Sequence, residues 1–293
     1  MTEGTTPVGE DCTFHFESDR SPMDPATAIP AFLKLSVDAY RSIAQGRSVP
    51  PAATIDRSAD AAMASGPAED DRAGERLADP LAIGSDSLAA LGAKGDGIQV
   101  FERLAQAYRE PHRHAHTLQR VSESLAQLRR WRDVADHPHE IVLATWFRDA
   151  VFDPMRHDNT GRSARLAFDT LSALGVELDL ARRIRDLVVA TRQDMPPITQ
   201  DARLMIDLDM AVLASSPDRY QQYEAQLRAE YAHVTGFIYQ RRRLEALKAL
   251  LARARIYQTD AARAALEGQA RVNLAAQVAH LQRRAEAPDL ARQ

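Results

Sequence analysis

The stretch PHEIVLATWFRDAV, residues 138–151, joins one of the longest apolar runs of the chain, residues 141–147, to the charged pair Arg148–Asp149. Pro138 stands at its start, as expected of a residue that punctuates helices. The run is much shorter than the ~20 residues that a bilayer span requires. It therefore predicts a helix in the core of a folded domain, and we expect the Asp149 carboxylate that follows it to be buried.

The same helical pattern continues on both sides of this segment. From residue 97 onward, apolar residues recur three and four positions apart, and no sustained alternation of period two occurs. Proline and glycine separate the predicted helices, which span residues 98–109, 116–132, 138–151, 161–174, 178–193, 201–214, 218–234, 236–255 and 259–283. We therefore expect an all-α domain over residues 96–285, followed by a flexible C-terminus at 286–293.

The first third of the sequence differs in composition. Residues 1–95 hold 8 basic and 15 acidic residues and long runs poor in apolar side chains, so we expect a mostly disordered acidic tail. One segment, residues 29–45, has apolar residues at roughly helical spacing. It is either a docking helix or a transient helix within a loose tail.

Charge and composition exclude several classes of protein. The chain of 293 residues carries a net charge of −4 and a single cysteine, Cys12, so it has no intrachain disulfide. It lacks a basic and apolar N-terminal signal and any long apolar span, which predicts a cytoplasmic protein without a membrane partner. Arg241–Arg243 form the densest basic run. Since residues 96–293 hold 29 basic and 26 acidic residues, we interpret this run as a solvated helix face and expect no nucleic-acid partner.

Histidines gather in one part of the chain. The segment EPHRHAHTLQR carries His112, His114 and His116 at alternate positions. In an extended segment, these three imidazoles point to one side and suit a single metal ion. A histidine-rich loop exposed to solvent explains the same pattern without a metal, and the spacing leaves both interpretations open.

A more informative pattern is a series of short motifs spread along the helical region. They are HTLQR at 116–120, TWFRDAVFD at 145–153, DNTGRSA at 158–164, TRQ at 191–193, IDLDM at 206–210 and LRAEY at 227–231. In order and spacing the chain resembles the HD superfamily, and more closely a branch of predicted metal-dependent phosphohydrolases, from about residue 108 to residue 274. The resemblance implies a helical bundle in which histidines and aspartates hold one or two divalent ions, whose bound water attacks a phosphoester.

The chain departs from this pattern at several ligand positions. His116 is kept, but Arg120 stands where the branch has a second histidine, and Arg148 replaces the histidine of the His-Asp pair before Asp149. Gln193 stands at a further histidine position, or Asp194 if the register shifts by one. The family's metal-ligand residues that this chain keeps are His116, Asp149 and either Asp207 or Asp209. Asp209 fits the last ligand better, and the two lie 200° apart on an ideal helix, so both cannot face the core.

Arginine cannot replace histidine as a metal ligand. Guanidinium has five donors, no acceptor, and a pKa above about 12, so it cannot coordinate a cation. Two guanidinium groups carry the same charge as a divalent ion, however, and Asp149 and Asp209 need a partner if they are buried. We therefore predict no cofactor and ion pairs from Arg120 and Arg148 to these aspartates. Arg228, in the LRAEY motif, is expected either in an ion pair within the bundle or at a substrate.

Three functions are compatible with this sequence. The first is a degenerate HD-type domain without metal or hydrolase activity, which acts by binding an unknown protein partner or ligand. In the second, the arginines and His116 bind a phosphorylated small molecule, because arginine forks suit phosphate oxygens. The third is an active metal-dependent phosphohydrolase with a shifted ligand set, drawn from His116, Asp149, His157, Asp207 and Asp209. A divalent metal is implied only in this third case.

Overall fold

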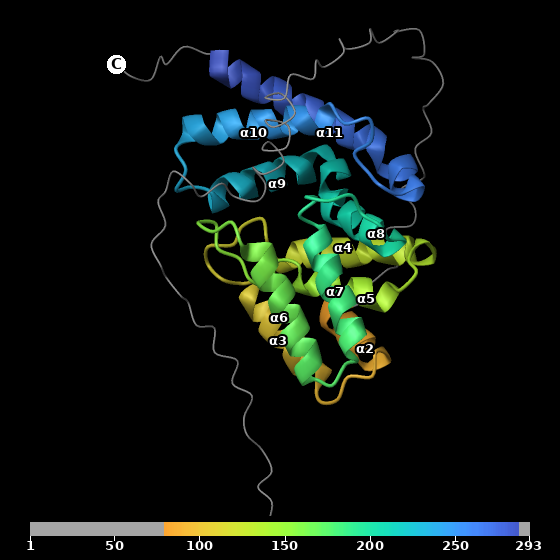
Figure 1. Cartoon of the computed structure of the whole chain (residues 1–293). Coiled ribbons are helices and arrows are strands. Elements are labelled where there is room, and N and C mark those ends of the chain that lie inside the picture. The colour runs from red at the N-terminus through yellow and green to blue at the C-terminus, as the bar shows by residue number, and fades with distance from the viewer. Residues whose placement is uncertain (1–78, 287–293) are drawn as a thin grey trace, which may run out of the picture.

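The computed structural model describes residues 79–286, and within this range the chain is all-α, as predicted. The possible helix at 29–45, the disorder expected for residues 1–78 and the flexible end at 287–293 lie outside the described residues. The described part holds ten α-helices, two short 3₁₀ helices and no strand. Figure 1 shows α9, α10 and α11 lying across one end of the bundle that the earlier helices form.

Each of the nine predicted helices begins within two residues of its predicted start. The α-helices are α2 (Pro80–Ala90), α3 (Gly97–Ala107), α4 (Leu118–Arg130), α5 (Pro138–Phe147), α6 (Asn159–Ala173), α7 (Leu178–Ala190), α8 (Gln200–Met210), α9 (Pro217–Glu230), α10 (Gly236–Leu251) and α11 (Asp260–Glu286). The 3₁₀ helices are η2 (Arg132–Val134) and η3 (Ala211–Ala214). All nine predicted helices are present. The larger differences lie at their C-terminal ends, as in α5, which ends at Phe147 rather than at residue 151.

The expected boundary of the tail at residue 95 is wrong. Helix α2 lies inside the range predicted to be disordered, and it packs against α3 and α5 with Leu88 buried. Gly84 explains how it packs so closely, because a Cβ atom at this position would come within 2.7 Å of the Phe101 ring. The composition of this segment hides the helix, since small residues at the contact provide little apolar periodicity.

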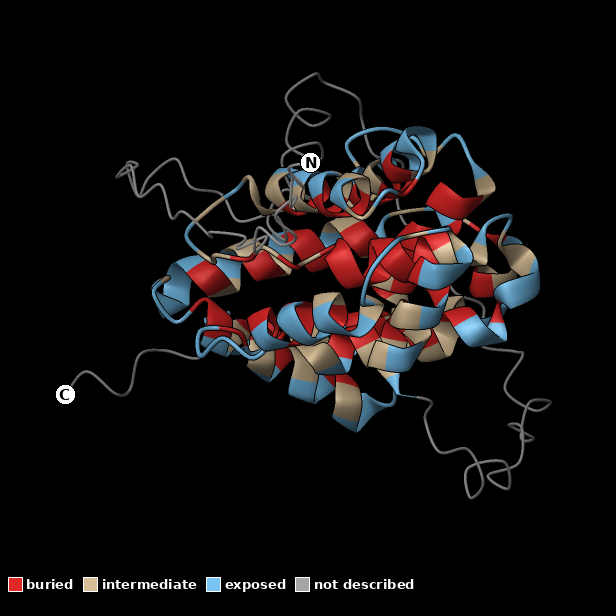
Figure 2. Cartoon of the chain, turned by 90° about the horizontal axis from the view of Figure 1, so that it is seen from below, coloured by how far each residue is buried: buried red, intermediate tan, exposed pale blue. Residues whose placement is uncertain are grey.

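Helix α5 lies at the centre of the core, as its apolar run predicts. All residues from Glu140 to Phe147 are buried, and α5 contacts α2, α4, α6, α7 and α8. Figure 2 shows buried residues, in red, concentrated along the inner helices, while exposed residues lie on the periphery. Each fully buried large apolar side chain contributes roughly 1.5–3 kcal/mol, so the surroundings of α5 fix the backbone at its C-terminal end, where Arg148 and Asp149 follow.

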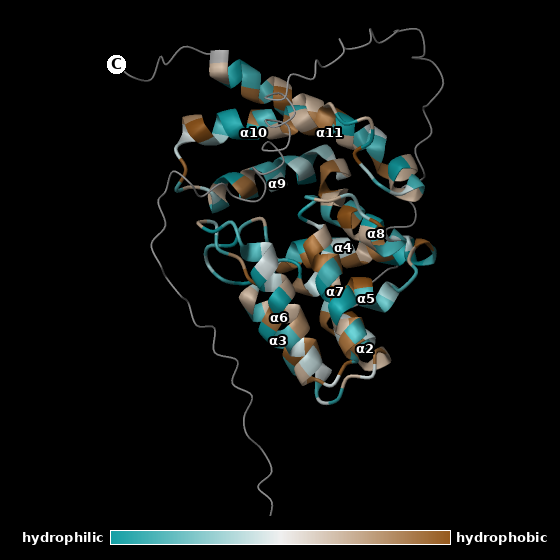
Figure 3. Cartoon of the chain, viewed as in Figure 1, coloured by the Kyte–Doolittle hydropathy of each residue, from teal (hydrophilic) through white to brown (hydrophobic). Residues whose placement is uncertain are grey.

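Helices α10 and α11 pack side by side, and the Gln240 carboxamide donates to the Leu281 carbonyl at 2.8 Å. Both helices mix hydrophilic and hydrophobic residues along their length (Figure 3). The interpretation of residues 241–243 as a solvated face is wrong for Arg243. This side chain is buried against Glu224 of α9, and Arg241 is the exposed member of the run. The run therefore serves partly to join α10 to α9.

Candidate functional site

The ends of four helices bring the predicted site residues together. Arg120 lies in the first turn of α4, and His116 lies just before that helix. Arg148 caps the C-terminus of α5, and Asp209 lies in the last turn of α8. Glu230 ends α9. Helix ends place functional groups at fixed positions because the core holds the helices themselves.

Arg148 lies at the centre of this group, with only 3% of its side chain exposed. Its Nε donates to Oδ2 of Asp149 at 2.9 Å, and its Nη1 lies 3.1 Å from Oδ1 of Asp209. Arg120 approaches the same aspartate, with Nη2 3.7 Å from Oδ1 and 2.6 Å from the backbone carbonyl oxygen. The ion pairs predicted between the two arginines and the two aspartates are therefore present. We call Arg120, Arg148, Asp149 and Asp209 the arginine–aspartate cluster.

The cluster stabilises the charged forms of Arg148 and Asp149. Burial acts to lower the pKa of Arg148, but the carboxylates of Asp209 and Asp149 outweigh it and raise that pKa above the ordinary value. Burial acts to raise the pKa of Asp149, but Arg148 and then His116 outweigh it and lower that pKa. A buried cation thus lies between two anions. Asp149 is only partly buried, so the expectation that its carboxylate is buried is met in part, and Asp209 keeps 31% exposure.

His116 and Glu230 form a second group beside the cluster. The carboxylate of Glu230 accepts the backbone N–H groups of His114, Ala115 and His116 at 2.9, 2.8 and 2.7 Å. Its other oxygen lies 2.7 Å from Nδ1 of His116, whose ring stacks on Phe152 with centroids 4.2 Å apart. Glu230 therefore fixes the backbone of the segment that leads into α4, and it also fixes the orientation of the His116 ring.

The pKa of His116 predicts how stability depends on pH. Burial acts to lower this pKa, but Glu230 and then Asp149 outweigh it, so the pKa is raised above 6.5. A raised histidine pKa contributes stability that is fully present below the unfolded value and is lost as pH rises through the folded value. We expect the stability difference between the wild type and His116→Gln to shrink as pH rises from about 6 to about 9, measured by urea unfolding. A difference that stays constant over this range would contradict the assignment.

Three predicted site residues lie outside both the arginine–aspartate cluster and the pair of His116 and Glu230. Asp207 is fully buried and accepts the backbone N–H groups of Gln258 and Thr259 at 2.6 and 2.8 Å, at the start of α11. Gln193 accepts from Arg253 at 2.9 Å. Arg228 donates to the backbone carbonyls of residues 231 and 234 and lies over the Tyr239 ring. Among residues 79–286 it forms no ion pair, which was one of the two roles considered for it. Of the two aspartates of α8, Asp209 belongs to the cluster, as the motif suggested.

The structure also reveals a residue that the sequence reasoning missed. Arg113 is buried and donates to the backbone carbonyls of Asp149 and Ala150 at 2.6 and 2.9 Å. It thereby supports the turn that follows α5. The alternation of the segment contained a signal for it: Arg113 and Ala115 point inward, whereas His112 and His114 are exposed. From the sequence, only the alternate histidines suggested a role, whereas the residues between them are the buried ones.

The alternate histidines do not gather around a common point. His112 contacts the carbonyl of Phe152, while His116 contacts Glu230. Within residues 79–286, no group of three or more His, Cys, Asp or Glu side chains is arranged to hold a metal ion. Among the helices of the same range, none combines the length and the hydrophobicity that a membrane span requires.

Comparison with known proteins adds no assignment. Neither the protein-family models, nor the curated proteins, nor the solved structures contain a match to this chain.

Proposed function

We propose that the domain is a metal-free relative of HD-type phosphohydrolases that acts by binding rather than by hydrolysis. The observation that carries this proposal is the position of Arg148, which lies buried between Asp149 and Asp209. These two carboxylates stand at the positions where the family pattern has aspartate ligands. With Arg120 beside Asp209, two guanidinium groups supply the positive charge that a divalent ion would supply in an active relative.

The donor set of the cluster does not suit a metal ion. Guanidinium offers no lone pair to a cation, and it repels one by its own charge. What fits a metal site is the pair of His116 and Glu230, because ligand histidines commonly donate their second ring N–H to a carboxylate. This pair supports descent from a metal-binding ancestor, and the two arginines support the loss of the ion.

The two alternative functions have less support. A phosphate bound by Arg148 must compete with Asp149, which accepts a hydrogen bond from Nε, and with Asp209, whose Oδ1 forms an ion pair with Nη1 at 3.1 Å. A shifted ligand set that includes Asp207 must take this carboxylate away from the start of α11, where three donors hold it. Both changes cost hydrogen bonds to a charged group, roughly 1.5–3 kcal/mol each.

Returning histidines to both arginine positions tests the proposal. We expect the Arg120→His/Arg148→His variant of the full chain to bind Mn²⁺, because two imidazoles join His116, Asp149 and Asp209. Added Mn²⁺ should raise the melting temperature of this variant and leave that of the wild type unchanged. Metal content after dialysis, measured by mass spectrometry, should stay far below one ion per chain in the wild type.

A matched control is the Arg182→His/Arg185→His variant, which adds two imidazoles on α7, where these arginine side chains are 49% and 40% exposed. It should gain no Mn²⁺ response. A wild-type chain that holds a stoichiometric ion and releases phosphate from phosphoesters would show that the proposal is wrong. If the double variant does not respond to Mn²⁺, Arg120 and Arg148 do not occupy the positions of metal ligands.

A further inference from the structure

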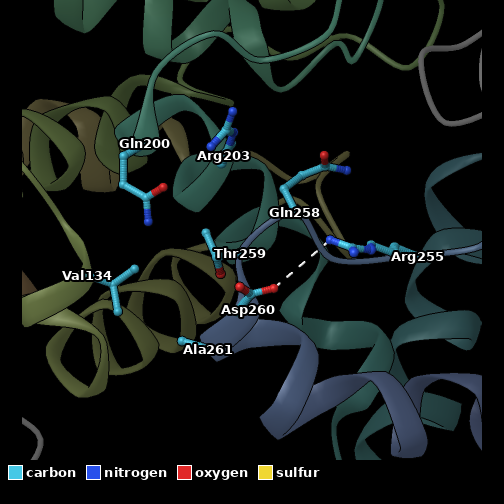
Figure 4. Close-up of a pocket in the computed structure, with 8 residues that line it drawn as sticks. All are labelled: Val134, Gln200, Arg203, Arg255, Gln258, Thr259, Asp260 and Ala261. Carbon is cyan, nitrogen blue, oxygen red and sulfur yellow. Dashed lines mark ion pairs between the residues drawn. The ribbon is translucent and has the colours of Figure 1, made fainter.

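A cavity lies at the opposite end of α8 from the arginine–aspartate cluster. It has a volume of about 620 Å³ and lies between the start of α8, the segment that leads into α11, and Val134 (Figure 4). Gln200 and Arg203 line it from α8, and Arg255 and Gln258 line it from the segment before α11. Ligand sites for small molecules commonly have volumes of about 300–1,000 Å³, so the space suits a small metabolite.

The cavity is surrounded by donors that the described fold leaves unused. Within residues 79–286, the guanidinium of Arg203 and the carboxamides of Gln200 and Gln258 have no hydrogen-bonding or ionic partner. Arg255 has one distant contact, with Nη1 4.0 Å from Oδ1 of Asp260. Polar side chains that line one space without partners are suited to a ligand that supplies acceptors.

The charge balance of the cavity favours an anion. Its lining has two arginines and one acid, Asp260, whose carboxylate is also 3.1 Å from Nη2 of Arg263 outside the lining. The first turns of α8 and α11 both lie at the cavity, and the N-terminus of a helix adds partial positive charge. The sum of these contributions is positive.

Asp207 holds one wall of the cavity in place. Its carboxylate accepts the backbone N–H groups of Gln258 and Thr259 and also the Thr259 hydroxyl, at 2.6, 2.8 and 2.7 Å. Thr259 in turn caps α11 by accepting from the N–H of Ala262. A wall fixed in this way presents Gln258 and the start of α11 to a ligand with little loss of conformational entropy on binding.

We propose that this cavity binds the phosphate group of a phosphorylated small molecule, with Arg203 and Arg255 as its main contacts. Arginine suits phosphate because its planar fork donates two parallel hydrogen bonds to two oxygens. The site is distinct from the arginine–aspartate cluster, since α8 runs from Gln200 at the cavity to Asp209 at the cluster. The proposal therefore holds whether or not the cluster descends from a metal site.

Calorimetric titration of the full chain with pyrophosphate and with ADP, at physiological salt, tests this proposal. We expect at least one of these probes to bind the wild type, and Arg203→Gln/Arg255→Gln to weaken that binding by about tenfold or more, because two charge-assisted contacts are lost. Both arginines are exposed, so the variant should keep the wild-type circular dichroism spectrum and melting temperature.

Two controls distinguish the cavity from other arginines. Arg241→Gln/Arg242→Gln removes the same charge from α10 and should leave the affinity unchanged. Arg120→Gln alters the cluster and should also leave it unchanged. The proposal is wrong if either control variant loses binding while the cavity variant still binds the probe. It is also wrong if neither probe binds the wild type. An equal loss in all three variants would indicate only non-specific attraction of anions and would overturn it as well.

Discussion

Replacing Arg148 with methionine is expected to lower the free energy of unfolding by about 3–5 kcal/mol, the usual cost of removing one partner from a buried ion pair. The side chain is 3% exposed and pairs with both Asp149 and Asp209, so both carboxylates lose their main partner. Because Asp209 keeps 31% exposure and can recover some hydration, we expect a value near the lower end of this range. Urea unfolding at neutral pH measures it.

Two further variants show whether charge is the cause. Arg148→Met/Asp149→Asn/Asp209→Asn removes the unpaired carboxylates and should recover a large part of the loss, because the cost lies in the isolated charges and these sites are coupled. Arg182→Met removes an exposed partner of Asp179 and should change stability by less than about 0.5 kcal/mol. If the single and triple variants are equally unstable, packing rather than charge pairing explains the role of Arg148.

The second large effect is expected at Glu230. Replacement by alanine removes the acceptor of three backbone N–H groups and the partner of His116 at once. A buried donor left without an acceptor costs roughly 1–3 kcal/mol. Since the carboxylate is fully buried and Ala115 is buried as well, we expect a total loss of about 3–4 kcal/mol.

Hydrogen exchange measured on the same variants locates the effect. The amides of residues 114–116 should exchange much faster in Glu230→Ala, whereas Glu230→Gln keeps an oxygen acceptor and should retain part of both the protection and the stability. Glu245→Ala, which removes an exposed partner of Arg241, is the matched control and should leave both nearly unchanged. Unaltered protection of residues 114–116 in Glu230→Ala would show that Glu230 does not organise this segment.

Most of the fold could be predicted from the sequence, and the exception has a clear cause. The nine helices from residue 97 onward follow from apolar residues spaced three and four apart, a pattern that does not depend on distant contacts. Helix α2 was missed because its contact with α3 depends on the absence of a side chain at Gly84, beside Phe101. A glycine in a helix appears unfavourable in the sequence, and only the packed neighbour shows its benefit.

Part of the candidate site could likewise be predicted before the structure, and part could not. The resemblance to the HD pattern implied that Arg148, Asp149 and Asp209 lie at one site, and the rule that a buried charge requires an opposite charge then predicted their pairing. Asp209 of α8 lies at the cluster, and Asp207 of the same helix lies at α11. Helical geometry predicts that the two side chains point in different directions, but it does not show which neighbour each one contacts. Arg113 alternates with the histidines, and only the histidines suggested a role from the sequence, although the residues between them are the buried ones.

The amino-acid sequence by itself determined the helical class of this domain and the starts of the predicted helices, because hydrophobic periodicity is a property of the residues themselves. The arginine–aspartate pairing followed once the resemblance placed these residues at one site, because a buried charge requires an opposite charge. Only the tertiary structure decided which groups meet across long separations, such as Asp207 with Thr259 or Glu230 with the segment before α4. The cavity at the start of α8 also belongs to this second category. Its donors come from segments that are far apart in the chain, and close packing of the helices alone brings them together.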